Sequence, residues 1–134
     1  MRATFIFSFV LLIFLLSCKK EDDNSIKFTM GKEAEFQFNQ DYTSSDGSLR
    51  FTLSEINDSR CPTGAMCVWA GEVAVTIEIT KPVADAIILT LPDDVSATSG
   101  KYNFKLLEVS PYPDIVTQIK MGDYLVELVI SVEN

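Results

Sequence analysis

The sequence predicts an all-β protein, an antiparallel two-sheet sandwich of the immunoglobulin-like kind with seven or eight short strands. Apolar and polar residues alternate with a period of two through most of the chain after residue 25. Glycine, proline and aspartate cluster between the alternating segments, as turns between short strands require. One face of each segment is polar, which is typical of antiparallel sheets with one face in water. A small closed β-barrel is the alternative.

The expected strands follow one another at short intervals. They are segments 26–30, 34–38, 49–54, 72–79, 87–91, 102–106 and 124–132, with a short edge strand at 115–119. The alternation is cleanest in 72–79, where valine and isoleucine take every second position. Polar loops are expected at 40–47 and 92–100, because Asp-Gly and Ser-Gly pairs favour turns there.

The first residues resemble a bacterial lipoprotein signal peptide. Arg2 precedes an apolar run of fourteen residues, 3–16, which is shorter than the ~20 residues of a membrane-spanning helix. Ser17 then supplies the small residue that precedes the acylated cysteine in such signals. We therefore expect residues 1–17 to be removed and Cys18 to carry diacylglycerol and palmitate. An ordinary signal peptide, or an uncleaved anchor, is the alternative.

The segment 18–25 is expected to be a flexible charged tether. Two lysines and three acidic residues follow Cys18, and a charged run without apolar residues cannot pack. The run also resembles the export signal that sends lipoproteins of Bacteroidota to the outer face of the outer membrane; a plain linker is the alternative. Together these features predict one domain, residues 26–134, anchored to the outer membrane through lipid and facing the cell exterior.

The composition argues against several classes of function. The net charge of −8 disfavours nucleic acid as a partner, and the chain contains no histidine, the commonest general base and zinc ligand. The sequence has no Gly-x-Ser-x-Gly motif and no phosphate-binding glycine loop. We therefore expect no enzyme activity, no cofactor and no metal. Loop carboxylates at Asp41, Asp46 and Asp93-Asp94 leave open a weak calcium site or a catalytic acid pair.

Two cysteines remain once Cys18 is assigned to lipid. Cys61 and Cys67 form an even pair in an exported chain, which predicts a disulfide. A metal site would need further ligands, and a redox pair is more typically Cys-x-x-Cys. Trp69 lies two residues after Cys67, so strand alternation would place both on one face. We expect the indole to be buried and to cover the disulfide from the core side.

Residues around this pair have two interpretations. Asp58 and Arg60 share a face if the chain is extended, and they could brace the loop as an ion pair. Alternatively, Arg60 and the apex of the loop, which includes Thr63 and Met66, form a recognition loop. Both interpretations remain open from the sequence.

The segment Asp58–Glu72 also carries a resemblance. Asp-Ser-Arg-Cys-Pro, four further residues and Cys-Val-Trp-Ala-Gly-Glu resemble a signature of small, uncharacterised exported bacterial proteins, many of them Bacteroidota lipoproteins. The Pro-Tyr-Pro at 111–113 and the last strand are similar too. The resemblance implies an exported location and a disulfide, and carries no activity. The expected function is a lipid-anchored, non-catalytic domain with a structural role or one that binds a protein, glycan or matrix component. An inhibitor or sensor that presents the Cys61–Cys67 loop to a protein such as a protease is the alternative.

Overall fold

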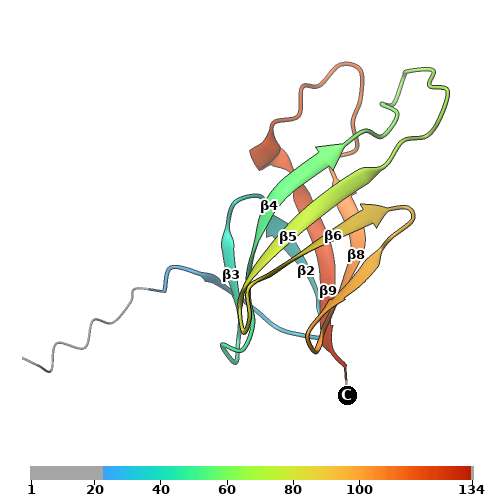
Figure 1. The fold of residues 1–134 in the computed structure, drawn as a ribbon. Coiled ribbons are helices and arrows are strands. Elements are labelled where there is room, and N and C mark those ends of the chain that lie inside the picture. The colour runs from blue at the N-terminus through green and yellow to red at the C-terminus, as the bar shows by residue number, and fades with distance from the viewer. Residues whose placement is uncertain (1–22, 134) are drawn as a thin grey trace, which may run out of the picture.

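A computed structural model describes residues 23–133, which fold as two β-sheets packed face to face (Figure 1). Sheet A has five strands in the order β1-β3-β4-β5-β6, and sheet B has four in the order β2-β9-β8-β7. The predicted all-β sandwich is confirmed. The two sheets are not closed into a barrel, so that alternative is wrong. The predicted signal peptide, the predicted lipidation site Cys18 and the predicted tether up to residue 22 lie outside the described residues.

The described residues form nine strands, one or two more than predicted. They are β1 (Ile26–Phe28), β2 (Glu33–Gln37), β3 (Asp41–Ser44), β4 (Arg50–Asp58), β5 (Val73–Lys81), β6 (Asp85–Leu91), β7 (Ser96–Ser99), β8 (Tyr102–Ser110) and β9 (Leu125–Val132). A 3-10 helix, η2 (Met121–Asp123), precedes β9. Within residues 23–133, no helix has the length and apolar character needed to cross a membrane.

Two strands form in segments expected to be loops. β3 is polar in sequence, yet Tyr42, Thr43 and Ser44 are buried. The backbone amide of Gln37 donates to the Tyr42 hydroxyl at 2.7 Å, so this burial satisfies polar groups. β7 consists of small residues that pair antiparallel with β8. Both strands form because of tertiary pairing and not because of their hydrophobic pattern.

The edge strand expected at 115–119 does not form. The Asp114 carboxylate accepts hydrogen bonds from the amides of Val116 at 2.7 Å and Thr117 at 2.5 Å. These local bonds compete with a strand ladder for the same donors. The segment is therefore part of a loop, in which Ile115 and Val116 are exposed and Ile119 packs against the core.

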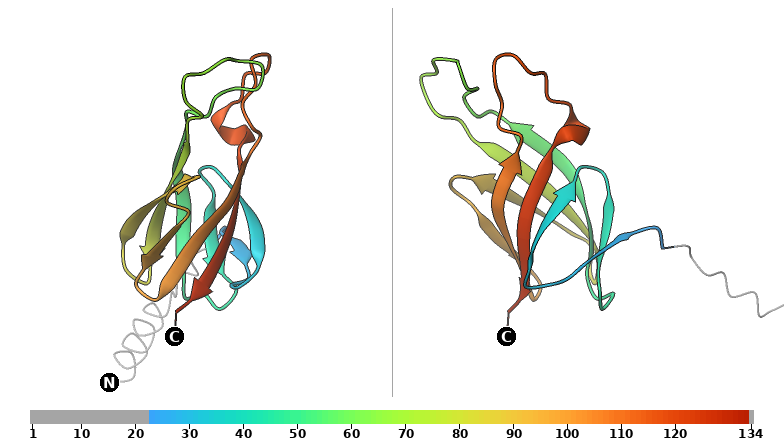
Figure 2. Two further views of the ribbon diagram at one scale, coloured as in Figure 1. Left: turned by 90° about the vertical axis from the view of Figure 1, so that its right-hand side faces the viewer. Right: turned by 180° about the vertical axis from the view of Figure 1, so that it is seen from behind.

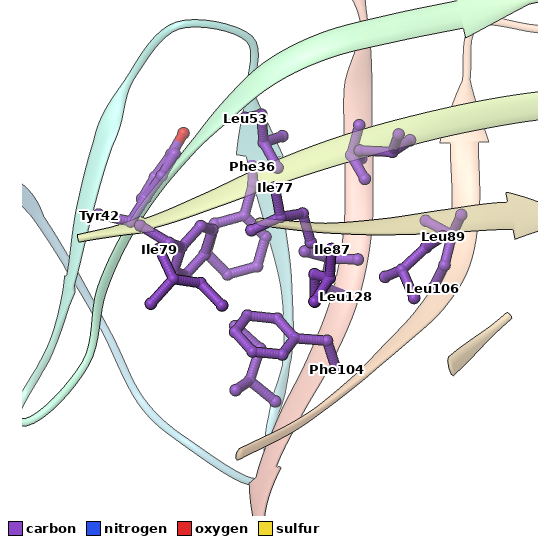
Figure 3. Packing of buried hydrophobic residues seen from close by; sticks show 14 of the residues in the cluster. Phe36, Tyr42, Leu53, Ile77, Ile79, Ile87, Leu89, Phe104, Leu106 and Leu128 are labelled. Atoms are coloured by element: carbon purple, nitrogen blue, oxygen red, sulfur yellow. The ribbon is translucent and has the colours of Figure 1, made fainter. Parts of the chain in front are cut away.

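The core lies between the sheets, where the alternating apolar residues of both meet. Phe51 and Phe104 face each other across the sheets with ring centroids 5.8 Å apart, and Phe36 packs on Phe51 at 5.2 Å. Figure 3 shows Leu53 and Ile77 pointing into the same space. The buried positions of β5 are its valines and isoleucines, as the period of two predicts.

Two long loops project from one end of the sandwich, and the last strand, β9, ends toward the other (Figures 1 and 2). One loop, residues 59–72, joins β4 to β5; the other, residues 111–124, joins β8 to β9. We call them the ring loop and the second loop, and together the tip. Asp23 forms an ion pair with Arg50 at 3.4 Å, at the end of β4 farthest from the tip.

Candidate functional site

The ring loop is closed by a disulfide between Cys61 and Cys67, whose Cα atoms are 5.9 Å apart. The predicted disulfide is therefore confirmed. The base of the loop continues the pairing of β4 with β5, because Ser59 N–H donates to Glu72 O at 2.8 Å and Cys61 N–H donates to Ala70 O at 2.7 Å. The loop thus emerges from a hydrogen-bonded stem and not from a flexible hinge.

Gly71 allows the two arms of this stem to approach each other. Its φ is +73°, a conformation that favours glycine. A Cβ atom added there would overlap the carbonyl group of Ser59 on the opposite arm. The backbone path at the base of the ring loop therefore requires glycine for two separate reasons.

A buried ion pair joins the ring loop to strand β8. The side chains of Arg60 and Asp58 are only 11% and 5% exposed. Arg60 Nε donates to Asp58 Oδ1 at 2.8 Å and Arg60 Nη2 donates to Asp58 Oδ2 at 2.6 Å, a bidentate arrangement. Arg60 also donates to the carbonyl oxygens of Val109 at 2.8 Å and Pro111 at 3.2 Å. Its guanidinium carbon lies 4.6 Å from the ring centre of Tyr112.

Asp58 is the centre of this arrangement. Burial alone would raise the pKa of its carboxyl, but hydrogen bonds and charge from Arg60, together with the hydroxyl of Tyr124, outweigh burial and hold the pKa below its usual value. The Tyr124 hydroxyl donates to Asp58 Oδ2 at 3.1 Å. Burial and the neighbouring carboxylate correspondingly raise the pKa of Tyr124. The cluster therefore holds an ionised aspartate and a neutral tyrosine at neutral pH.

The backbones of the two loops are also joined directly. Thr63 N–H donates to Pro113 O at 2.9 Å, and Ile115 N–H donates to Thr63 O at 3.2 Å, which makes an isolated parallel bridge. The Ile115 side chain covers Gly64, where an added Cβ would lie 3.0 Å from it. The ring loop and the second loop are therefore connected at the level of the ring as well as at its base.

The outer surface of the ring loop is apolar. Met66 and Val68 are fully exposed, and Trp69 is 66% exposed. The expectation that the indole is buried over the disulfide is therefore wrong. Strand alternation does not extend to Trp69, because β5 begins only at Val73 and the turn at Gly71 redirects the chain between them.

The structure divides the residues predicted from the sequence into two groups. Asp58, Arg60 and Thr63 hold the loop, whereas Met66 and Trp69 face solvent. The contacts of Asp58 and Arg60 are those of the bracing interpretation, and recognition by the loop stays a prediction. The second loop was not predicted as part of the site, yet four of its apolar side chains are also exposed: Tyr112, Ile115, Val116 and Met121. The apolar pair Ile115-Val116 was the available signal, and it was assigned to a strand.

Two of the four loop carboxylates considered for calcium, Asp41 and Asp46, have protein partners. Asp41 accepts from Arg50 at 3.0 Å and from Thr52 at 2.5 Å. Hydrogen bonds from Ser44 and Ser48 lower the pKa of Asp46 to about 2. Among residues 23–133, no three or more histidine, cysteine, aspartate or glutamate side chains gather as a metal site would require.

Comparisons with known proteins give no further assignment. No family model, curated protein or solved structure matches this chain. The function must therefore be inferred from the tip itself.

Proposed function

We propose that this protein is a lipid-anchored, non-catalytic recognition domain of the bacterial outer membrane that binds a protein partner through the ring loop. One observation carries the proposal: Met66, Val68 and Trp69 are held in water on a loop that a disulfide and a buried ion pair keep in place. Isolated exposed apolar residues are ordinary, but a group of them on a braced projection is typical of interaction sites.

The bracing favours binding because it lowers the cost of ordering the loop. Immobilising one flexible side chain at an interface costs about 0.5–1.5 kcal/mol, and a mobile backbone adds to this. In the ring loop, the disulfide and the bonds to Thr63 have already fixed the backbone. Tryptophan and methionine are also enriched at protein interfaces.

The chemistry of the loop favours a protein over a glycan. Between Cys61 and Gly71, threonine is the only residue with a hydroxyl, amide or charged side chain. Recognition of a sugar by its hydroxyl groups would need several such donors and acceptors, because a buried polar group without a partner is unfavourable. An apolar surface on a protein meets no such penalty.

The position of Asp23, at the end of the domain opposite the ring loop, supports the proposal that the tip points away from the membrane. Asp23 contacts Arg50 at the first residue of β4, and the ring loop follows the last. The nine residues of β4 span about 26 Å. Four residues lie between Cys18 and Asp23, and the five Cα-to-Cα steps give a reach of at most about 18 Å. With lipid on Cys18, the tether end of the domain faces the membrane and the tip faces outward.

The recognition role is tested by affinity capture with the soluble domain from residue 24 onward. We expect Trp69→Ser combined with Met66→Ser to abolish retention of a specific partner from the cell surface. Ile88→Ser is the matched control, because Ile88 is 60% exposed on β6, away from the tip. Equal retention by the tip variant and the control, or no specific partner for any form, would contradict the proposal.

The anchor has its own tests. Cys18→Ala should release the protein from the membrane fraction or block its processing, and unchanged processing and retention would exclude lipidation at Cys18. Replacement of residues 19–23 by alanine should protect the domain from protease added to intact cells. Equal digestion of both forms would leave the segment a plain linker.

A protease inhibitor is the second candidate function. It is favoured because backbone hydrogen bonds to the second loop hold the ring. The bonds from Thr63 to the second loop hold the ring from behind and leave Ala65 and Met66 exposed. The test measures inhibition of purified serine and cysteine proteases by the domain and by its Met66→Ser variant. Cleavage of the ring without inhibition would make the ring a substrate and exclude this candidate.

A further inference from the structure

We propose that the ring loop and the second loop act as one wedge, which enters an apolar cleft with a basic border on a folded protein. This proposal rests on the proposed recognition function and deepens it. It adds a second set of contact residues, Tyr112, Ile115 and Val116, and it specifies the chemistry of the partner.

The two loops are connected as one body. Arg60 joins the ring loop to the carbonyl groups of Val109 and Pro111, and Thr63 joins it to Pro113 and Ile115. Displacing the second loop alone would break the bonds to Pro111, Pro113 and Ile115, and displacing the ring loop alone would also remove Arg60 from the buried Asp58. The apolar side chains of both loops therefore reach a partner together.

The projecting shape of the two loops favours a partner with a concave surface. Both loops extend beyond the ends of the two sheets, as the side view in Figure 2 shows. A projecting surface buries its apolar area only against a concave one. The segments 61–71 and 115–119 contain no charged residue, so the centre of the contact is uncharged. The partner surface that fits is therefore a cleft with apolar walls.

The two loops that form the wedge carry net negative charge. In segments 61–72 and 111–124, Lys120 is the single basic residue, against Glu72, Asp114 and Asp123. Arg60 does not alter this balance, because Asp58 neutralises it.

Sheet B adds a stripe of three glutamates just below the tip. Glu127 lies directly opposite Glu35 on one side and Glu108 on the other. Like charges placed directly opposite on neighbouring strands are unfavourable, and a basic partner would relieve this repulsion. The same negative charge disfavours a membrane that contains anionic lipid. These features favour a protein with lysine and arginine at the border of its cleft.

The wedge formed by the two loops is tested by photo-crosslinking in the full-length lipidated protein on intact cells. The photoreactive residue p-benzoylphenylalanine replaces Met66, Val116 or, as the control, Val83, which is exposed at the opposite end of the sandwich. We expect adducts with one and the same protein from Met66 and Val116, and none with it from Val83. An adduct from Met66 without one from Val116 would refute the wedge and leave the recognition function standing. Absence of adducts from both would refute the recognition function itself.

The basic border is tested by removing charge without changing the apolar contacts. We expect Glu108→Gln combined with Glu127→Gln to lower the association rate of the crosslinked protein about tenfold at low salt, and to flatten its salt dependence. The pair Glu33→Gln and Glu78→Gln, outside the stripe, removes the same charge and is the control. Equal rates for the two pairs would refute a basic border.

A lipid surface is tested with vesicles of phosphatidylcholine, alone or mixed with phosphatidylglycerol. Trp69 is the only tryptophan in the chain, so its fluorescence reports on the ring loop directly. We expect no shift in the emission maximum with either vesicle. A shift to shorter wavelength would overturn the protein cleft and assign the tip to a membrane.

Discussion

Replacing Arg60 by methionine tests the brace of the tip most directly. The substitution removes the guanidinium but keeps a long apolar stem. The guanidinium donates four hydrogen bonds, two to the Asp58 carboxylate and one each to the carbonyl oxygens of Val109 and Pro111. Arg60→Met therefore leaves the Asp58 carboxylate, which is almost fully buried, with only the Tyr124 hydroxyl and one backbone amide as donors.

The expected loss of stability follows from that orphaned charge. Removing one partner of a buried ion pair typically costs about 3–5 kcal/mol. For a domain of this size, 1 kcal/mol lowers the melting temperature by roughly 4 °C, so the expected decrease is about 12–20 °C. The loops could instead separate locally and let water reach Asp58, which would limit the global loss. Hydrogen exchange at the Thr63 and Ile115 amides would then increase while the melting temperature fell less.

A double-mutant cycle separates the orphaned charge from lost packing. Asp58→Asn combined with Arg60→Met removes both charges, so it should destabilise less than Arg60→Met alone. The assays are thermal unfolding by circular dichroism and hydrogen exchange by mass spectrometry. The reasoning would be refuted if Arg60→Met changed neither the melting temperature nor exchange in the two loops, or if the double variant were the less stable one.

Three further predictions concern the same end of the molecule. Gly71→Ala should lower the free energy of unfolding by well over 1 kcal/mol, because Gly71 has a positive φ and an added Cβ would overlap the opposite arm of the stem. The control is Gly47→Ala, because Gly47 has a similar φ of +72° but no atom near an added Cβ, so the difference between the two variants measures the effect of the overlap. Replacing Cys61 and Cys67 by serine should leave the domain folded but lower its stability by about 2 kcal/mol, measured by urea unfolding, after mass spectrometry of the unreduced protein has verified the disulfide. Because the pKa of Asp58 is lower in the folded state, its ionisation stabilises the fold above the ordinary value of 3.8, and this contribution is lost as the pH falls through the folded pKa. The difference in stability between the native protein and Asp58→Asn should therefore shrink between about pH 7 and pH 3, and a constant difference would contradict the assignment.

The sequence predicted the strands wherever burial determines the residue pattern. β5 and β9 bury every second side chain, so their alternation directly reflects the two-layer architecture. β3 and β7 could not be predicted in this way. Their buried side chains include Thr43, Ser44 and Ser99, whose polar groups are satisfied by hydrogen bonds that form only in the folded domain.

Only the part of the candidate site that lies within one short segment could be predicted from the sequence. Asp58, Arg60 and the cysteine pair lie within one short segment, so their proximity can be inferred from spacing alone. The second loop is distant in sequence and meets the ring loop only through the pairing of β8 with β9 and the packing of the two sheets. No local pattern indicates that Ile115 covers Gly64 or that Val109 accepts a hydrogen bond from Arg60.

The error at Trp69 bears on the function. A tryptophan among apolar residues next to a buried strand is usually core, and hydropathy alone cannot separate a core segment from an apolar binding loop. The two differ in what surrounds them. Here the ring loop leaves the sheet at Gly71, and the buried pair of Asp58 and Arg60 fixes its base while the indole stays in water. A loop that served only to join β4 to β5 could be shorter and polar, and it would need neither the ion pair nor the bridge to the second loop. The proposed partner, which would bury this end of the molecule, accounts together for the exposed apolar side chains and for the polar groups that hold them in place.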